Sequence, residues 1–460
     1  MRSLVFLLII VFATFGVGSQ NSHPKEDSVI FKQFFHSALS GYEAYNNLEY
    51  LCKKFSGRLA GTPEAAGAVD FTHSIMRNMN FDTVYSQSTI VENWRRGNAE
   101  KGEIISKHYG NKRVRVCALG KSIGTGFPGL SKNVIEIADI DELKNTLSEK
   151  IEGKIVFFNK PFSVEHYNTF ISYGEVASSR YHGAFEAAIK GASAVIVRSL
   201  THAIDTFPHT GSMEYRDDVV KIPAFAISTS DANILSGLLK KDPQLLLYLE
   251  SHCHGLKESV SYNVIGEIKG SEFPDKIITV GAHLDSWDIT EGAHDDGAGC
   301  IQSIEVARLF FELDIKPRHT IRIVMFMDEE MGQRGARTYS DSKRATDEEH
   351  YFALESDRGG FTPRGFSIDA DSIFFDSIGL WKDLFKIYGM YEFDKGYSGV
   401  DISFLKKYNI PLVALSTDMQ RYFDYQHSAS DTFETVNHRE LQLGSAAIAA
   451  FVFFIDKYGY

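Results

Sequence analysis

From Asn263 to the C-terminus, short apolar runs alternate with amphipathic stretches. The runs occupy residues 277–282, 321–327, 352–355 and 412–415. Mostly apolar runs of this length are typical of parallel strands buried on both faces. The stretch 297–313 is typical of a helix, because four apolar residues share one face: Cys300, Ile304, Ala307 and Phe311. This order predicts an α/β fold with a doubly wound sheet, whose ligands collect at the carboxyl ends of the strands.

The N-terminal half has two other patterns. Between residues 42 and 80 the apolar positions have helical spacing, interrupted by the turn-like segment 56–63, which predicts two helices joined by a loop. From about residue 113 to 249 the pattern changes to short β-type runs at 114–119, 154–158 and 194–197, with one helical stretch before the last. We therefore expect a separate small α/β or β module there.

The first residues have the pattern of a targeting segment. Met1-Arg2 is followed by an apolar run over 4–15 and by small residues at 16–19. This predicts a signal peptide over residues 1–19 and entry into the secretory pathway. A membrane anchor and a buried N-terminal helix are the alternatives, but the run is short for a span and no later stretch reaches 18 uninterrupted apolar residues. We expect no stable membrane anchor after cleavage.

Composition narrows the function. The 460 residues are 43% hydrophobic, which excludes a disordered or fibrous chain. The 48 Lys and Arg against 60 Asp and Glu give a net charge of −12, with no long basic run, so a nucleic-acid partner is not expected. Four distant cysteines form no C-x-x-C motif, and their spacing selects none of the possible pairings.

Metal-ligand residue types follow the predicted strands. Five of them follow the end of a run within three residues: His283, Asp285, Glu329, Glu330 and Asp357. A sixth, Asp295, comes twelve residues beyond His283. A seventh, His427, lies in the loop after the last run. Because the carboxyl ends of parallel strands meet at one edge, two imidazoles and several carboxylates are expected to lie together.

Each of these residues alone has an ordinary structural explanation, such as a surface His–Asp pair, a helix start or an N-cap. Their recurrence at four successive strand ends favours a metal site. Imidazole with carboxylate suits Zn²⁺, and a bridging carboxylate holds two metals roughly 3.5–4 Å apart. Such a pair would lower the pKa of a bridging water toward about 7 and make it a nucleophile, while a further carboxylate takes its proton.

Five motifs carry a family resemblance. They are His283-Leu284-Asp285-Ser286-Trp287-Asp288, His294-Asp295-Asp296-Gly297-Ala298-Gly299, Glu329-Glu330-x-Gly332, Leu354-Glu355-Ser356-Asp357 and Gln426-His427-Ser428. In this order they resemble the M28 co-catalytic dizinc exopeptidases, over nearly all of the mature chain, and within that family a carboxypeptidase branch. The resemblance implies a doubly wound mixed sheet of the zinc exopeptidase, phosphorylase/hydrolase-like type.

The resemblance also implies the roles of the site residues. His283 and Asp357 would hold one zinc, Glu330 and His427 the other, and Asp295 would bridge the two zinc ions. Glu329 would be the general base, and Asp285 would orient His283. Several relatives have a Tyr directly before the second-site His, where this chain has Gln426. The oxyanion donor therefore stays open, and Arg358 and Tyr425 are candidates for binding substrate.

By the same resemblance, residues 20–112 and 257–460 form the peptidase domain. Residues 113–256 form an inserted protease-associated (PA) domain that covers or shapes the cleft, the alternative being a passive surface domain. Relatives of this type cleave short peptides, dipeptides with free termini in particular, and occur as secreted or lysosomal homodimers. We therefore expect a homodimeric exopeptidase of this kind.

Several alternatives remain. An M28 aminopeptidase is one, because the sequence leaves open which peptide end is recognised. A single-zinc glutaminyl cyclase and a non-catalytic receptor-like chain are others, although the full ligand set disfavours both. The segment 120–124 matches G-x-S-x-G around Ser122, and 124–129 matches G-x-G-x-x-G. Neither is followed by a residue pattern that starts a helix, which disfavours a serine hydrolase and a dinucleotide site.

Overall fold

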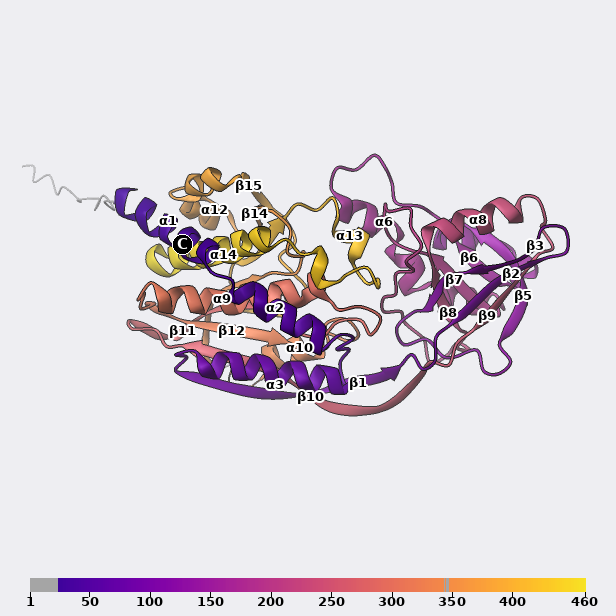
Figure 1. Cartoon of the computed structure of the whole chain (residues 1–460), viewed down its shortest axis with the longest axis horizontal. Coiled ribbons are helices and arrows are strands. Elements are labelled where there is room, and N and C mark those ends of the chain that lie inside the picture. The colour runs from indigo at the N-terminus through magenta and orange to yellow at the C-terminus, as the bar shows by residue number, and fades with distance from the viewer. Residues whose placement is uncertain (1–23, 343, 345–346) are drawn as a thin grey trace, which may run out of the picture.

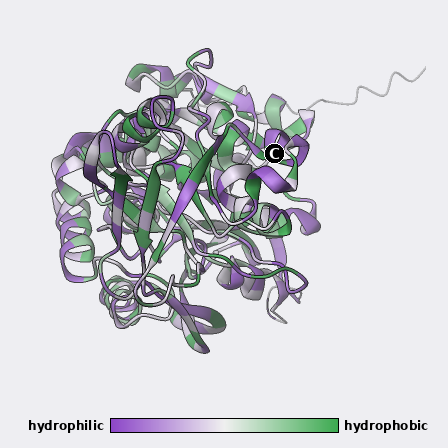
Figure 2. Ribbon diagram, turned by 90° about the vertical axis from the view of Figure 1, so that its right-hand side faces the viewer, coloured by the Kyte–Doolittle hydropathy of each residue, from purple (hydrophilic) through white to green (hydrophobic). Residues whose placement is uncertain are grey.

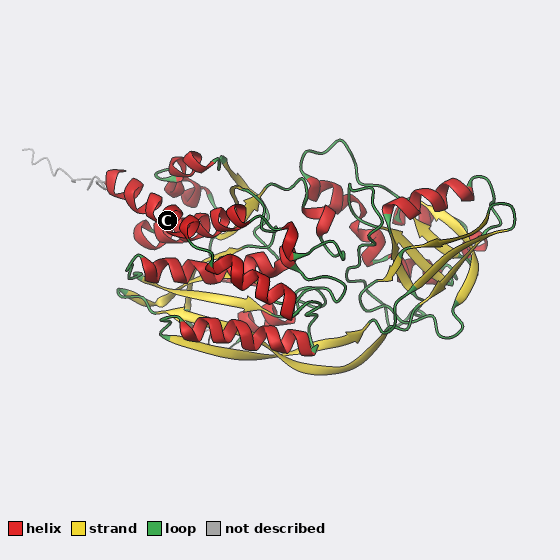
Figure 3. Ribbon diagram, viewed as in Figure 1, coloured by secondary structure: helices red, strands yellow, loops and turns green. Residues whose placement is uncertain are grey.

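The computed structural model describes residues 24–342, 344 and 347–460. The expected signal peptide therefore lies outside the described residues. The described chain forms two parts that lie side by side along the long axis of the molecule, and each part is built around an eight-stranded sheet (Figures 1 and 3).

The first sheet contains the strands predicted from the apolar runs. Its order is β1 (Thr83–Arg95), β10 (His254–Ile268), β12 (His319–Phe326), β11 (Phe273–His283), β13 (Glu349–Glu355), β16 (Leu412–Thr417), β14 (Pro363–Asp369) and β15 (Glu392–Lys395). β11 runs parallel to β12 and β13, and β13 runs parallel to β16. β10 and β14 pair antiparallel with β12 and β16, so the sheet is mixed as expected. The four predicted strands are confirmed, and they are neighbours.

The helices of this part are α1 (Pro24–Ser40), α2 (Glu43–Lys54), α3 (Pro63–Asn78), α9 (Ala298–Glu312), α10 (Arg334–Asp341), α12 (Ser372–Ile378), α13 (Tyr422–Tyr425) and α14 (His438–Tyr458). Shorter helical turns are η1 (Ala293–Gly297), η2 (Lys382–Tyr388), η3 (Ile402–Tyr408) and η4 (Phe433–Thr435). The two helices expected between residues 42 and 80 are α2 and α3, and the expected helix over 297–313 is α9.

Helices cover both faces of the first sheet. Along β12, Ile323 packs into the core under α1, α3, α9 and α14, whereas its neighbour Val324 packs against α10 and η3 on the other face. This alternation confirms the doubly wound arrangement. Figure 2 shows hydrophobic segments concentrated in the interior of the molecule. The four cysteines are buried free thiols.

α14 is long and apolar enough to cross a membrane by length and composition, but 78% of that apolar window is buried inside the protein. It packs against α9 and α1. In this structure α14 is therefore a core helix of the first part.

The second sheet is formed by the middle of the chain. Its order is β3 (Gly110–Val114), β2 (Lys101–Ser106), β9 (Leu246–Glu250), β5 (Leu130–Ile137), β6 (Ile155–Phe158), β7 (Ala194–Arg198), β8 (Ala224–Ile227) and β4 (Val116–Ala118). Its helices are α4 (Ile140–Asn145), α5 (Ser148–Ile151), α6 (Thr169–Tyr181), α7 (Gly183–Ile189) and α8 (Thr229–Leu239). We call this part the insert.

The insert differs from the expected segment 113–256 at its N-terminal end. β2 already pairs with β9 and β3, so the second sheet begins by Lys101 rather than near residue 113. β3 is mostly exposed, and the β2–β3 hairpin is rich in charged and polar residues, so it shows no apolar run that would mark its strands.

A two-stranded ribbon joins the two parts. β1 and β10 pair antiparallel from Thr83 opposite Glu267 to Arg95 opposite His254. Beyond the ribbon, the Arg96 guanidinium donates to both oxygens of Asp288, at 2.8 and 2.7 Å. A Cβ at Gly120 would overlap the buried indole of Trp287, so the insert also packs tightly on this loop. The insert is thus fixed to the loop that follows β11.

Candidate metal centre

The first strand end of the site is the loop after β11. His283 is the last residue of β11 and is fully buried. Arg58, in the loop between α2 and α3, donates to the carbonyl oxygens of Leu284, Glu291 and Gly292 at 2.6–2.8 Å. This buried guanidinium therefore holds the loop that leads from His283 to Asp295.

Asp295 lies between two histidines that come from different strand ends. Its Oδ1 lies 3.1 Å from Nε2 of His283, and its Oδ2 lies 3.3 Å from Nε2 of His427. Asp431 holds this segment in place, because its carboxylate accepts the backbone N–H groups of His294 and Asp295 at 2.7 and 3.1 Å. One carboxylate thus presents one oxygen to each imidazole.

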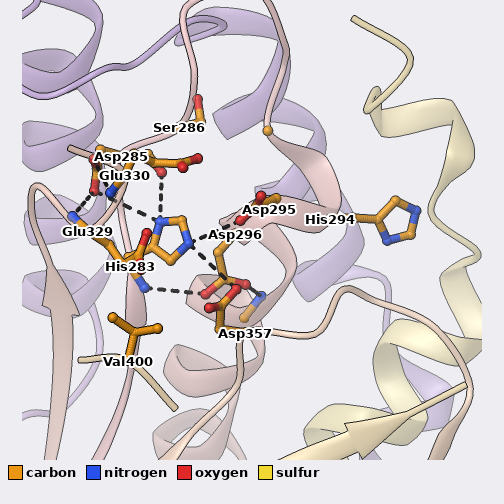
Figure 4. A network of polar contacts seen from close by, with 12 residues as sticks. His283, Asp285, Ser286, His294, Asp295, Asp296, Glu329, Glu330, Asp357 and Val400 are labelled. Atoms are coloured by element: carbon orange, nitrogen blue, oxygen red, sulfur yellow. Dashed lines mark hydrogen bonds and ion pairs between the residues drawn. The ribbon is translucent and has the colours of Figure 1, made fainter. Parts of the chain in front are cut away.

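Each histidine has a second acid beside it. Asp357, after β13, places Oδ1 3.5 Å from Nε2 of His283. Glu330, after β12, places Oε2 3.1 Å from Nε2 of His427. The five ligands that the resemblance implied therefore form two adjoining groups that share Asp295, and Figure 4 shows the His283 side of this cluster.

Asp296 also lies within ligand distance of His283 and Asp357. Its Oδ2 accepts the backbone N–H of His283 at 3.3 Å, and its Oδ1 accepts that of Gly299 at 3.0 Å. Both oxygens are thus committed to the backbone. His294, its other neighbour in the motif, points away from the cluster (Figure 4), and its ring stacks on that of Phe361.

Asp285 supports the turn after β12. Its carboxylate accepts the backbone N–H groups of Asp328, Glu329 and Glu330, at 2.8, 3.1 and 3.4 Å. Nδ1 of His283 lies 3.0 Å from the main-chain oxygen of Asp285 and 3.9 Å from its Oδ1. The contact that orients the imidazole is therefore with the main chain of Asp285, and its side chain positions the two glutamates.

The two adjacent glutamates have different surroundings. Glu330 is 5% exposed, and its Oε2 faces His427. Glu329 is partly exposed and lines the pocket described below. Burial raises the pKa of both carboxyls well above their usual range.

Burial lowers the pKa of His427 to about 4, so this imidazole is neutral at neutral pH, as a metal ligand must be. Burial also opposes protonation of His283, but hydrogen bonds to Asp295 and Asp357 outweigh it and raise the pKa of His283 well above its usual value.

The donor set fits divalent cations. Asp295 Oδ2 and Glu330 Oε1 are buried and accept no hydrogen bond from the described residues. Buried carboxylates that lie this close together repel one another unless a cation or protons neutralise them. Two imidazoles with three carboxylates are ligands that Zn²⁺ prefers, and the shared Asp295 matches the geometry of a bridging ligand.

A pocket of about 740 Å³ opens onto the cluster and is lined by residues of both parts. Its volume lies within the range of roughly 300–1,000 Å³ typical of small-ligand sites. The insert contributes aromatic residues from α6. The ring of Tyr173 stacks on that of Phe423, with 4.8 Å between the ring centroids, and the ring of Phe170 stacks on that of Tyr422, with 5.6 Å between the centroids. The insert therefore forms one wall of the pocket.

The two candidates for substrate binding differ in position. Arg358 lines the pocket, where its guanidinium donates to the Tyr397 carbonyl oxygen at 2.7 Å and lies over Phe170. Tyr425 stacks on His294 and is absent from the lining. The phenol that does face the cluster is that of Tyr422, which donates to Asp357 Oδ1 at 3.4 Å.

Sequence reasoning missed Arg58, Asp431 and Tyr422, because none belongs to a motif next to a predicted strand. The Ser122 hypothesis has no structural support. Ser122 is 1% exposed, its hydroxyl donates to the Ile123 carbonyl oxygen, and it accepts the backbone N–H of Ala224. A nucleophile in this position is closed to substrate.

Comparisons with known proteins agree with this geometry. The sequence profile of peptidase family M28 matches residues 263–452. Carboxypeptidase Q of Xenopus laevis is 32% identical over 85% of this chain and 80% of its own length. A peptidase M28 precursor from Shewanella amazonensis SB2B superposes with a TM-score of 0.89 and 34% identity, over 93% of this chain and 96% of its own.

A zinc aminopeptidase from Bacillus subtilis shares the fold, with a TM-score of 0.63 and 20% identity over 89% of this chain and 94% of its own.

Proposed function

The chain belongs to peptidase family M28, and from that membership and the geometry of the cluster we propose that it is a two-zinc exopeptidase that hydrolyses short peptides, dipeptides with free termini in particular. Its similarity to carboxypeptidase Q over nearly the whole chain makes it a metallo-exopeptidase. The observation that carries the two-metal proposal is Asp295, whose two oxygens face His283 and His427 separately.

In this proposal, metal binding and proton transfer are carried out by different side chains. Bound zinc ions would supply Lewis acidity to the scissile carbonyl and to the attacking water. His283 and Asp357 would hold one ion, Glu330 and His427 would hold the other, and Asp295 would be shared. A carboxylate oxygen of Glu329 accepts a proton from the attacking water, and Glu329 then donates this proton to the leaving amine.

Asp285 keeps the two glutamates in position, because its carboxylate accepts hydrogen bonds from the backbone N–H groups of Glu329 and Glu330.

We propose further that the insert is a protease-associated domain and that it limits substrate size. Its support is the pocket wall formed by Phe170 and Tyr173 of α6. The resemblance to M28 exopeptidases and the N-terminal signal-peptide pattern support export to the extracellular space or the lysosome. The resemblance alone supports assembly as a homodimer. N-terminal sequencing of protein recovered from a secreting cell and its mass in solution test these two points.

Metal content tests the site directly. We expect purified protein to contain about two zinc ions per chain, measured by elemental analysis. A strong chelator should abolish turnover and lower the melting temperature, because a ligand present at about 1,000 times its Kd contributes about 4 kcal/mol to folding. Re-addition of zinc should restore both. A stoichiometry near one would contradict the two-metal proposal and favour the single-zinc cyclase alternative.

Substrate length tests the function. Free dipeptides should be cleaved with kcat/KM at least about 10-fold above that of peptides of ten residues, because a pocket of this volume accommodates a short ligand. A panel of free, N-acetylated and C-amidated dipeptides, assayed with and without chelator, checks this and separates carboxypeptidase from aminopeptidase behaviour. Efficient cleavage within a folded protein would refute the proposal.

A further inference from the structure

Arg180 is a buried cation of the insert that lines the catalytic pocket. It lies in the last turn of α6 and is 7% exposed. The N-terminus of α6 is tied to the first part, since Thr169 Oγ1 donates to the Met419 carbonyl oxygen at 2.8 Å. Gly211 leaves room for the guanidinium, because a Cβ there would lie within 2.5–2.7 Å of it. The position of Arg180 is thus built by both parts of the molecule.

The Arg180 guanidinium contacts an aromatic residue and a histidine rather than an acid in the described part of the chain. Across residues 24–342, 344 and 347–460, no carboxylate forms an ion pair with Arg180. Its contacts are the Tyr173 hydroxyl at 2.5 Å, the Tyr173 ring, and Nδ1 of His427 at 3.4 Å. Its Nε is buried without an acceptor. A buried guanidinium with unfilled donors costs free energy, so an acceptor is expected.

His427 does not serve as that acceptor in the proposed site. If its Nε2 faces a metal, its Nδ1 carries the hydrogen, and this N–H donates to the Thr210 carbonyl oxygen at 3.3 Å. Nδ1 then has no lone pair for Arg180. Arg180 lines the pocket, so a ligand bound in the pocket can supply an acceptor to the guanidinium.

We propose that Arg180 binds the free α-carboxylate of the peptide substrate, and that it makes the enzyme selective for the carboxyl end. A planar carboxylate matches the paired N–H groups of a guanidinium. The other pocket arginine, Arg358, already donates to Tyr397 and Ser416. This inference rests on the proposed peptidase function and adds to it the end of the peptide that is recognised.

The test compares a free dipeptide with its C-terminal amide. Wild-type enzyme should have a KM about 10- to 100-fold lower for the free dipeptide, as expected for one charge-assisted contact. Arg180→Gln should raise the KM of the free dipeptide by that factor, leave the amide's KM unchanged and change kcat little, because the contact is present in ground and transition states alike. Arg180→Lys should retain part of the preference.

Controls separate binding from structure. The Arg180→Gln variant should match the wild type in zinc content and melting temperature, even though Arg180 lies near His427 in the wild type. Arg216→Gln, an exposed insert arginine paired with Asp218, should leave the kinetics unchanged. Calorimetric binding of a dipeptide isostere with a CH2–NH group in place of the peptide bond should show the same carboxylate preference and the same loss.

The outcomes are distinct. If the wild type cleaves neither substrate, the proposed function fails, and the isostere still tests Arg180. If it cleaves and binds the free dipeptide and the amide equally, the function stands and the role of Arg180 is wrong. The role is also wrong if Arg358→Gln, and not Arg180→Gln, removes the preference, or if Arg180→Gln weakens both substrates equally.

Discussion

Glu329→Gln is expected to lower dipeptide turnover by about 10²- to 10⁴-fold while both zinc ions stay bound. The amide keeps the shape of the side chain but cannot take a proton. Glu329 is partly exposed to the pocket, and its backbone N–H bond to Asp285 is independent of the side chain. Steady-state kinetics and elemental analysis of the same preparation provide the two readouts.

The neighbouring substitution should behave differently. Glu330→Gln weakens the group that faces His427, so it should lower zinc content, and added zinc should partly restore activity. Glu149→Gln, an exposed substitution in α5, controls for the change of charge. The two roles are assigned wrongly if Glu329→Gln loses zinc while Glu330→Gln keeps it, or if Glu329→Gln turns over at the wild-type rate.

Asp295→Ala should remove both zinc ions and all measurable turnover, because this side chain is shared by both halves of the cluster. His427→Ala should empty mainly the second site. With zinc present, Asp295→Ala should melt well below wild type, since it loses the stabilisation by bound metal.

The same experiment in chelator gives the control. The metal-free wild type keeps several buried carboxylates close together, and Asp295→Ala removes one of them. In the metal-free protein this carboxylate also pairs with His283 at 3.1 Å, so the metal-free variant should melt below the metal-free wild type, but by less than the difference seen with zinc present. A variant that binds two zinc ions, or that is equally destabilised with and without zinc, would show that Asp295 has a structural role only.

The central strands could be predicted because both of their faces are buried. β12 is buried along its whole length and is apolar over 323–327, so its position is visible without any partner. β1 could not be predicted in this way. Most of it is exposed or half-buried, and its polar residues depend on pairing with β10, more than 150 residues further along the chain.

The site residues also differ in how far the sequence alone predicts them. His283, Glu330 and Asp357 each follow a predictable strand, so chain order alone groups them. Arg180 meets His427 from 247 positions away, and no local pattern marks that contact. Tyr425 was the candidate because it is close in sequence to His427, but Tyr422, three residues earlier on the short α13, is the one that reaches Asp357.

The ribbon of β1 and β10 has a consequence for protein engineering. Arg95 and His254 lie opposite one another at its end, so the chain leaves for the insert and returns from it at one place. A short turn could close these two ends as a β-hairpin and excise the insert in one step. All five residues proposed to hold zinc would remain in the shortened chain, whereas Arg180, Phe170 and Tyr173 would be removed. Grafting a different insert onto this hairpin offers a way to change which peptides are accepted without redesigning the metal ligands.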